Sequence, residues 1–369
     1  MGFLTSSQTE VWNLHVAGMK VSEIARKLDR DESSIRERLR LARLKMEREI
    51  DPAVKGAMDK MGITTVPRQV WFKDDTLSIQ VRIDDVDEEA LTFADTLSAV
   101  LSSLPSAMVM PKPRKSIADL MAVYPIFDLH VGLRAHQEIS GANMDLQTAK
   151  SDILTAMAEV MHNTPNARRG VIINGGDFTH QTDDSNMTRR SGHILDVAGR
   201  NAPTVQVALE ILCTLIEMAL RKHEVVEYYS VPGNHDPQNW ETIQFALRER
   251  YRNNKRVKID VRWDEFSMIE HGEVALFIHH GDKRKPKDLA FYCAAAFQEL
   301  WGRSKFRMLL TGHLHHLKEE EYPGIIWRQF ASPSVRDHYS ASHAYLSKRL
   351  ISSMVFDLRS KKFDYTAEL

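Results

Sequence analysis

The segment VVEYYSVPGNHD, residues 225–236, decides how this chain folds. Its first half is rich in β-branched and aromatic residues, which is typical of a buried strand. A Pro-Gly pair ends that run, and Asn234, His235 and Asp236 follow directly. Turn preference explains a glycine, an asparagine and an aspartate after a strand, but it does not explain the histidine. The segment therefore predicts a strand that carries chemically useful side chains at its carboxyl end.

Four more segments repeat this pattern of an apolar run that ends in aspartate or histidine. They are LMAVYPIFDLH (120–130), GVIINGGD (170–177), EVALFIHHGD (273–282) and FRMLLTGHLHH (306–316). Helical stretches at 144–161 and 201–222 separate several of the strands, which predicts an α/β architecture with a largely central sheet. Functional groups of open α/β sheets gather beyond the carboxyl ends of the strands, so five such ends imply one shared site.

The predicted site combines carboxylate, amide and imidazole side chains and has no cysteine. Such ligands suit Mn²⁺, Fe or Zn²⁺ in a reactive centre better than they suit a structural zinc site. They are too many for one four-coordinate ion, so two metals that share a carboxylate form the economical arrangement, and paired ions are a common device for displacement at phosphorus. The candidate side chains are Asp128, His130, Asp177, Asn234, His235, His280, His313 and His315.

The order of these motifs resembles that of the calcineurin-like metallophosphoesterases. The matching elements are Asp-Leu-His at 128–130, Gly-Asp at 176–177, Gly-Asn-His-Asp at 233–236, a strand-terminal His280 before glycine, and Gly-His-Leu-His at 312–315. The resemblance covers about residues 117–358. It implies an α/β fold with a central β-sandwich or sheet flanked by helices, and hydrolysis of a phosphoric ester with two divalent metal ions. We expect manganese, with iron and zinc as alternatives.

The same resemblance implies a role for each residue of the site. It places Asp128, His130 and His315 on one ion, Asn234, His280 and His313 on the other, and Asp177 between both. His235 stays off the metals, contacts the phosphate and acts as the general acid, while Asp236 orients its ring. His279 and His316 are expected to be non-ligands, because alternation along a strand turns His279 away from the side to which His280 points.

The N-terminal segment has a purely helical pattern. VSEIARKL (21–28) and SSIRERL (33–39) flank a tight polar turn and resemble the helix-turn-helix of bacterial sigma-factor and response-regulator domains. The apolar residues that could meet in one small core are Val11, Leu14, Ile24, Ala25, Leu28, Ile35 and Leu39. The side chains left for DNA phosphates or base edges are Ser33, Arg36, Arg40 and Arg43. Small three-helix units also serve in protein docking or dimerisation, and that alternative stays open.

Changes in the pattern of apolar, polar and proline residues divide the chain into three segments. These are a helix-turn-helix segment at 1–50, a small α+β segment with a linker at 51–116, and a catalytic segment at 117–369. Within the middle segment, residues 68–83 predict two short strands around an Asp-Asp turn, and residues 87–104 predict a helix. The proline-rich stretch 105–115 predicts a linker. No chemistry is assigned to this middle segment.

Composition and the lack of long apolar runs indicate the compartment in which the protein is expected. The net charge is -1, with 43% hydrophobic and 27% charged residues, which is ordinary for a soluble globular protein. No apolar run reaches the roughly 20 residues of a membrane span, and the start lacks the features of a signal peptide, so we expect a cytoplasmic protein without a membrane partner. Cys213 and Cys293 lie in apolar helical contexts and are expected to be buried thiols rather than a disulfide.

Together these patterns favour a two-metal phosphodiesterase that acts on nucleic acid, a DNA nuclease whose core is related to the bacterial SbcD-type enzymes. The chain is also similar to metallophosphoesterases of phage and prophage genomes, which places it in a bacterial or phage-infected cytoplasm. Lys283, Arg284 and Lys285, shortly after His280, are candidates to contact the DNA backbone. The alternatives are the same chemistry on a small phosphoester, a cyclic nucleotide or a phosphoprotein, and a regulatory DNA-binding protein with an idle core. Assembly of the chain into a homo-oligomer is a further alternative that stays open.

Overall fold

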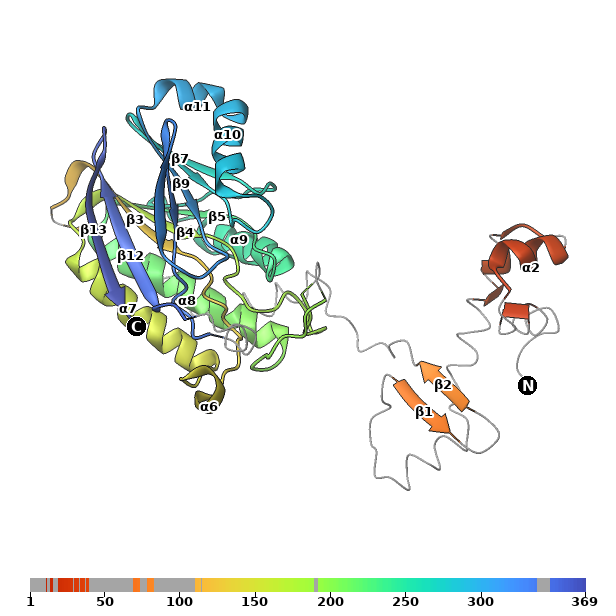
Figure 1. Ribbon diagram of the computed structural model, residues 1–369. Helices are drawn as coiled ribbons and strands as arrows, with labels where there is room; N and C mark the ends of the chain where they lie inside the picture. Colours follow the sequence, from red (N-terminus) through yellow and green to blue (C-terminus); the bar gives the residue numbers. More distant parts are fainter. Residues whose placement is uncertain are drawn as a thin grey trace. The chain divides into compact units, whose positions relative to one another are not determined.

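The computed structural model contains two compact units, residues 1–90 and 91–369 (Figure 1). It describes residues 11, 14–15, 19–28, 30–32, 34–36, 38–39, 69–73, 78–82, 110–113, 115–188, 192–336 and 346–369. Each unit is described by itself. The three-segment division, with boundaries near residues 50 and 116, stays a prediction.

The first unit contains a small helical core. Helix α2, Val21–Lys27, begins where the backbone N–H of Lys20 donates to the Glu23 carboxylate at 2.9 Å. The cluster around it consists of buried Val11, Ile24, Ala25, Ile35 and Leu39, with Leu14, Met19, Val21 and Leu28 partly buried against them. Every residue predicted to form this core belongs to the cluster. Burial of aliphatic side chains at helical spacing therefore explains why this short segment is helical.

The first unit also contains a two-stranded antiparallel sheet. Strand β1, Gln69–Lys73, pairs with β2, Ser78–Arg82. The two strands predicted within residues 68–83 are thus confirmed. The turn between them, the predicted helix at 87–104 and most of the predicted linker lie outside the described residues.

The larger unit is built on two sheets. Within the described residues, the first sheet has the order β13-β12-β3-β4-β5-β6. Its strands are β3 Ile117–Ile126, β4 Ala167–Asn174, β5 Val225–Ser230, β6 Val257–Ile259, β12 Leu350–Phe356 and β13 Lys361–Glu368. Strands β3 to β6 run parallel, and β12 and β13 join antiparallel. The carboxyl ends of β3, β4 and β5 consequently lie at one edge of the sheet.

The second sheet has the order β10-β11-β9-β8-β7. Its strands are β7 Ser267–His271, β8 Val274–Ile278, β9 Phe306–Thr311, β10 Lys318–Tyr322 and β11 Ile325–Gln329. Strands β8, β9 and β11 run parallel, while β7 and β10 are antiparallel to their neighbours. The five strands predicted from the sequence correspond to β3, β4 and β5 of the first sheet and β8 and β9 of the second.

Helices cover the outer faces of both sheets, so the unit has four layers (Figure 1). The helices are α6 Gln137–Ser140, α7 Leu146–Asn163, α8 Asn201–Lys222, α9 Pro237–Tyr251, α10 Pro286–Ala296 and α11 Gln298–Arg303. One core cluster joins α7, α8 and α9 to the first sheet, a second lies between the sheets, and a third joins α10 and α11 to the second sheet. The predicted fold class, a β-sandwich flanked by helices, is confirmed.

Helix α8 is long and apolar enough, by length and composition alone, to cross a bilayer, yet 67% of its most apolar stretch is buried. Its apolar side chains belong to the core cluster on the first sheet. Cys213 of α8 and Cys293 of α10 are buried free thiols, as predicted. Helix α8 is therefore accounted for as a core helix.

A buried polar pair lies inside this core. The His223 Nδ1 atom donates to the Ala167 carbonyl oxygen at 2.7 Å, so Nε2 is the acceptor for the Tyr124 hydroxyl at 2.8 Å. The ring packs so closely on Gly170 that a Cβ atom there would overlap it. Burial lowers the pKa of His223 to about 4. The core thus holds this histidine in its neutral form.

We predict that His223 makes the protein sensitive to mild acid. The unfolded chain protonates this ring near its ordinary pKa of 6.5 and the folded chain only near 4, so its contribution is complete above pH 6.5 and is lost as the pH falls towards 4. Between pH 7 and pH 4.5 the free energy of unfolding should fall by about 2 to 3 kcal/mol more for the wild type than for His223→Gln. Urea titrations of both proteins measure this difference. Equal losses would contradict the assignment.

Candidate metal centre

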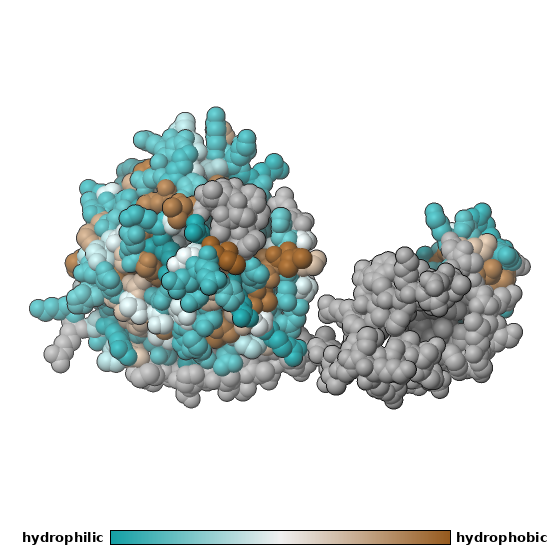
Figure 2. Space-filling model, turned by 60° about the horizontal axis from the view of Figure 1, so that its bottom comes forward, coloured by the Kyte–Doolittle hydropathy of each residue, from teal (hydrophilic) through white to brown (hydrophobic). Residues whose placement is uncertain are grey.

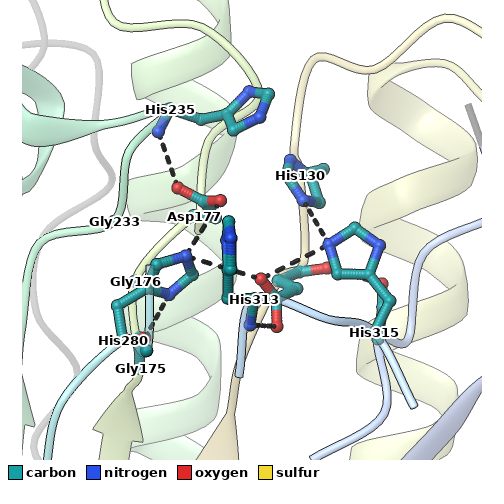
Figure 3. A network of polar contacts seen from close by, with 12 residues as sticks. His130, Gly175, Gly176, Asp177, Gly233, His235, His280, His313 and His315 are labelled. Atoms are coloured by element: carbon teal, nitrogen blue, oxygen red, sulfur yellow. Dashed lines mark hydrogen bonds and ion pairs between the residues drawn. The ribbon is translucent and has the colours of Figure 1, made fainter. Parts of the chain in front are cut away.

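Five loops meet at the edge where the parallel strands of both sheets end. Backbone hydrogen bonds join them: the N–H of Asp128 donates to Gly176 O at 3.1 Å, and that of His130 donates to Asp177 O at 2.9 Å. In the second sheet the N–H of Gly312 donates to His280 O at 2.8 Å. Figure 3 shows the resulting arrangement, in which imidazole and carboxylate groups from both sheets converge. The shared site predicted from the strand ends is therefore present.

The first group of convergent side chains is Asp128, His130 and His315, whose potential ligand atoms lie within 4.8 Å of one another. The Nε2 atoms of His130 and His315 are 3.1 Å apart, and His315 Nε2 lies 3.4 Å from Asp128 Oδ1. Burial is the main cause that lowers the pKa of His130 well below its usual value, and neighbouring His235 and His315 add to it. His130 is thus a neutral imidazole, the form that binds a metal ion.

The second group is Asp177, His280 and His313, again with potential ligand atoms within 4.8 Å of one another. His280 donates from Nδ1 to the Gly175 carbonyl oxygen at 3.0 Å, and its Nε2 atom lies 3.1 Å from Asp177 Oδ2. Three of the residues predicted for each ion therefore lie together in the groups predicted for them, with Asp177 contributing to the second group.

Buried polar atoms in the site lack hydrogen-bond partners within the described residues. They include Asp128 Oδ1 and Asn234 Oδ1. An unpaired buried acceptor is costly, and a carboxylate is costlier still. A cation at each group would satisfy the oxygen beside it, so the donor set fits divalent metal ions.

The titration of His280 leads to the same conclusion. Burial lowers its pKa, but the carboxylates of Asp177 and Asp128 more than offset this and raise it to about 10. The two carboxylates thus favour positive charge at Nε2, and a metal ion bound there would take the place of a proton.

The candidate ligands share an unusual backbone conformation. Among the described residues other than glycine, those with positive φ are Asp128, His130, Asp177, Asn186, His313 and His315. Only Asn186 is outside the predicted ligand set. Positive φ is sparsely populated for side chains with a Cβ atom and persists where the surroundings enforce it, typically at functional sites.

Two glycines make room for the carboxylates. A Cβ atom on Gly233 would overlap Asp177 Oδ1, and one on Gly312 would overlap Asp128 Oδ2. The backbone N–H of His313 in turn donates to Asp128 Oδ2 at 2.8 Å. Glycine at these positions lets the backbone approach the acidic groups closely enough to hold them.

We predict that Gly233→Ala weakens metal binding, because the added methyl group displaces the Asp177 carboxylate. Mn²⁺ affinity measured by isothermal titration calorimetry should fall by about 10- to 100-fold, the range found when the orientation of a ligand is disturbed. Gly302→Ala is the matched control, since a Cβ atom there meets nothing within 4 Å and the residue lies in helix α11. Unchanged affinity in the Gly233 variant would contradict the arrangement.

The predicted role of Asp236 needs correction. Its carboxylate does not orient the His235 ring but accepts backbone N–H groups, from Gly233 at 2.9 Å, Phe178 at 2.7 Å and Asp177 at 3.2 Å. The His235 ring is instead held by its Nδ1 atom, which donates to the His180 carbonyl oxygen at 2.8 Å. Asp236 thus holds the loop after β4 and the loop after β5 together, because their buried N–H groups need an acceptor.

His180 is a residue of the site that the sequence interpretation missed. Its Nδ1 atom lies 3.2 Å from His130 Nδ1, and its ring stacks on that of His235 at a centroid distance of 5.2 Å. The potential ligand atoms of these three histidines lie within 4.8 Å of one another. The sequence did offer one indication that His180 belongs to the site, because it lies three residues after Asp177 in the same loop.

The two histidines expected to be non-ligands are outside both groups. His279 accepts the Gly281 N–H at its Nδ1 atom and packs its ring on Phe266, on the opposite side of the strand end from His280. His316 is exposed, with its Nδ1 atom 2.8 Å from the Leu314 carbonyl oxygen.

The residues predicted to contact nucleic acid are only partly described. Ser33, Arg40 and Arg43 lie outside the described residues. Arg36 is exposed and pairs with Glu32 at 2.8 Å. In the second unit Lys283 pairs with Glu265 at 2.5 Å, while Arg284 and Lys285 are exposed and have no ion pair within the described part of the chain. Figure 2 shows that hydrophobic residues on the face turned forward form separate patches among hydrophilic ones.

Comparison with known proteins gives structural matches only. No family model and no curated protein matches the chain. A predicted phosphoesterase from Streptococcus pneumoniae TIGR4 is similar at 10% identity and a TM-score of 0.28, over 68% of this chain and 98% of that one. An archaeal phosphodiesterase is similar at 13% identity and a TM-score of 0.35, over 68% of this chain and 100% of that one. Wild-type Vps29 complexed with zinc, from Entamoeba histolytica, is similar at 14% identity and a TM-score of 0.29, over 67% of this chain and 99% of that one. These values are too low to transfer a function.

Proposed function

We propose that this chain is a divalent-metal-dependent hydrolase of phosphodiester bonds in nucleic acid, a DNA nuclease of the calcineurin-like type. The observation that carries the proposal is the pair of Asp/His groups that share one buried edge, with the His235 ring beside them. Oxygen and imidazole donors without thiolate favour manganese, with iron or zinc as alternatives. Ions held by two adjacent groups of this kind suit displacement at phosphorus.

The two groups of side chains would each hold one metal ion. Asp128, His130 and His315 would bind one ion, and Asp177, Asn234, His280 and His313 would bind the other. When bound, the ions would neutralise the phosphate oxygens and stabilise the charge that develops in the displacement. The buried carboxylates and imidazoles already converge, so little reorganisation precedes binding.

His235 supplies the proton-transfer group. Its Nδ1–H is occupied by the His180 carbonyl oxygen, so Nε2 is the atom left to meet the substrate. In its protonated form Nε2–H can donate to a phosphate oxygen and then pass its proton to the leaving alkoxide. The fixed ring orientation keeps that atom in place, and such a positioned imidazole contributes about 10²- to 10⁴-fold to the rate.

Positive side chains near the centre support nucleic acid as the substrate. Arg284 and Lys285 follow His280 by a few residues, are exposed, and have no ion pair among the described residues. Exposed cations beside a metal centre attract a polyanionic backbone. The small helical core of the first unit, which resembles a helix-turn-helix, adds a second candidate contact to DNA.

We predict that His235→Ala lowers Mn²⁺-dependent cleavage of single- and double-stranded oligodeoxynucleotides by about 10²- to 10⁴-fold, since the leaving oxygen loses its proton donor. Metal content, determined by elemental analysis, should be unchanged because His235 is outside both ligand groups. His316→Ala is the control, an exposed histidine beside a ligand that should retain full activity. Cleavage at the wild-type rate in the His235→Ala variant would contradict this mechanism.

A second candidate, the same chemistry on a small phosphoester, has one specific observation in its favour. An open pocket of about 530 Å³, in the segments that follow β3 and β4, is lined by Arg134, His136, Ile139 and Leu195 among others but by none of the candidate ligands. Its size suits a small organic ligand. Rapid turnover of a chromogenic monoester without cleavage of DNA would favour this candidate over a nuclease.

A further inference from the structure

Large aromatic side chains are exposed on one part of the second unit. Trp263, in the segment before β7, is 73% exposed, and Phe291 and Tyr292 on α10 are 59% and 51% exposed. Aromatic residues at these positions gain little from the protein's own core. Exposed aromatic groups are a common feature of ligand-binding surfaces.

These side chains are held by other aromatic rings. Tyr292 stacks on Phe266 at a centroid distance of 4.9 Å and an interplanar angle of 26°. Phe266 also packs on His279 at 4.7 Å, and Trp263 packs on Phe245 at 5.2 Å. We name the side chains of Trp263, Phe266, Phe291 and Tyr292 the aromatic platform. Phe266 and Tyr292 are held by packing on each other, and Trp263 is held by packing on Phe245, so little conformational entropy is lost when Trp263 and Tyr292 bind a ligand.

Positive side chains border the aromatic platform. The ion pair between Lys283 and Glu265, at 2.5 Å, joins the segment after β8 to the segment before β7. Arg284, Lys285 and Lys287 follow, are exposed, and have no ion pair within the described ranges of the chain. Exposed Asp264 and Asp288 lie in the same two segments and reduce the net positive charge. Stacking rather than charge must therefore supply most of the affinity of this surface.

The basic segment beside the aromatic platform begins close to the metal centre. Lys283 is three residues after the candidate ligand His280, so its Cα atom lies at most about 11 Å from that of His280. Phe266 packs on His279, whose ring lies on the other side of the strand end from His280. The basic segment, rather than the rings, is therefore the part of this surface from which a bound strand can continue towards the metal centre.

We propose that the aromatic platform binds a single-stranded segment of nucleic acid, with bases stacked on Trp263 and Tyr292 and backbone phosphates beside Arg284, Lys285 and Lys287. This inference rests on the proposed function and narrows its substrate to single strands. The faces of the bases are covered by their neighbours in a duplex, so a stacking surface selects unpaired bases. Base stacking on aromatic groups is tolerant of sequence, because every base has a flat π-face.

The test is the affinity of the full chain for a fluorescein-labelled 20-nucleotide oligo-dT in EDTA, measured by fluorescence anisotropy. Trp263→Ala and Tyr292→Ala should each weaken binding roughly 5- to 150-fold, the loss expected per stacked base. Trp263→Phe should restore most of the affinity. Ile117→Ala is the control, since Ile117 is 53% exposed at the start of β3, a strand of the first sheet. Equal affinity in wild type and both alanine variants would overturn the inference.

A second measurement locates the bound strand and separates this inference from the proposed function. An oligonucleotide carrying 5-iododeoxyuridine should crosslink on irradiation to peptides that contain Trp263 or Tyr292, and crosslinks confined to other peptides would contradict the platform. Mn²⁺-dependent hydrolysis of bis(p-nitrophenyl) phosphate, a small diester, should be the same in Trp263→Ala and wild type. Hydrolysis without platform binding would overturn the inference alone, and binding without any hydrolysis would overturn the proposed function alone.

Discussion

The burial of the Asp177 carboxylate is the constraint on which the rest of the site depends. Burial raises its pKa, yet neighbouring His280 and His235 outweigh this and hold the pKa well below its usual value. A buried negative charge is tolerated only when donors and positive charge surround it. The His235 backbone N–H, at 2.7 Å from Oδ1, and the His280 ring, at 3.1 Å from Oδ2, supply both. The His280 contact joins the second sheet to the first, and the His235 contact joins two loops of the first sheet.

The second buried carboxylate, Asp236, explains how the loops keep their shape. Burial and the nearby Asp177 raise its pKa to about 6, against backbone N–H groups that lower it. Those N–H groups come from the loop after β4 and from Gly233, so one carboxylate holds two loops in register. Positive φ at the ligand residues and glycine beside the carboxylates follow from the same crowding. The chemistry of the site and its backbone strain thus have one cause.

Much of this site could be predicted from the sequence, because buried parallel strands are apolar runs and their polar ends share an edge. Asp128, Asp177 and His280 were visible for that reason. The second sheet was less visible, since β10 reads KEEEY and has little apolar character. The support of His235 was also hidden: its acceptor is a backbone carbonyl, and no side-chain motif encodes that contact. The resemblance implied an orienting role for Asp236, and the sequence alone could not show that its carboxylate accepts backbone N–H groups instead.

The most direct test of the account is the number of metal ions bound per chain. After dialysis against Mn²⁺ and removal of excess metal, elemental analysis of the wild type should give about two ions per chain, as paired Asp/His groups require. Asp177→Asn should retain fewer, because that carboxylate is shared, whereas Asn186→Ala, which alters the one described positive-φ residue outside the ligand set, should retain both. A wild-type chain that binds no manganese, iron or zinc, or an Asp177→Asn variant that keeps both ions, would contradict the account.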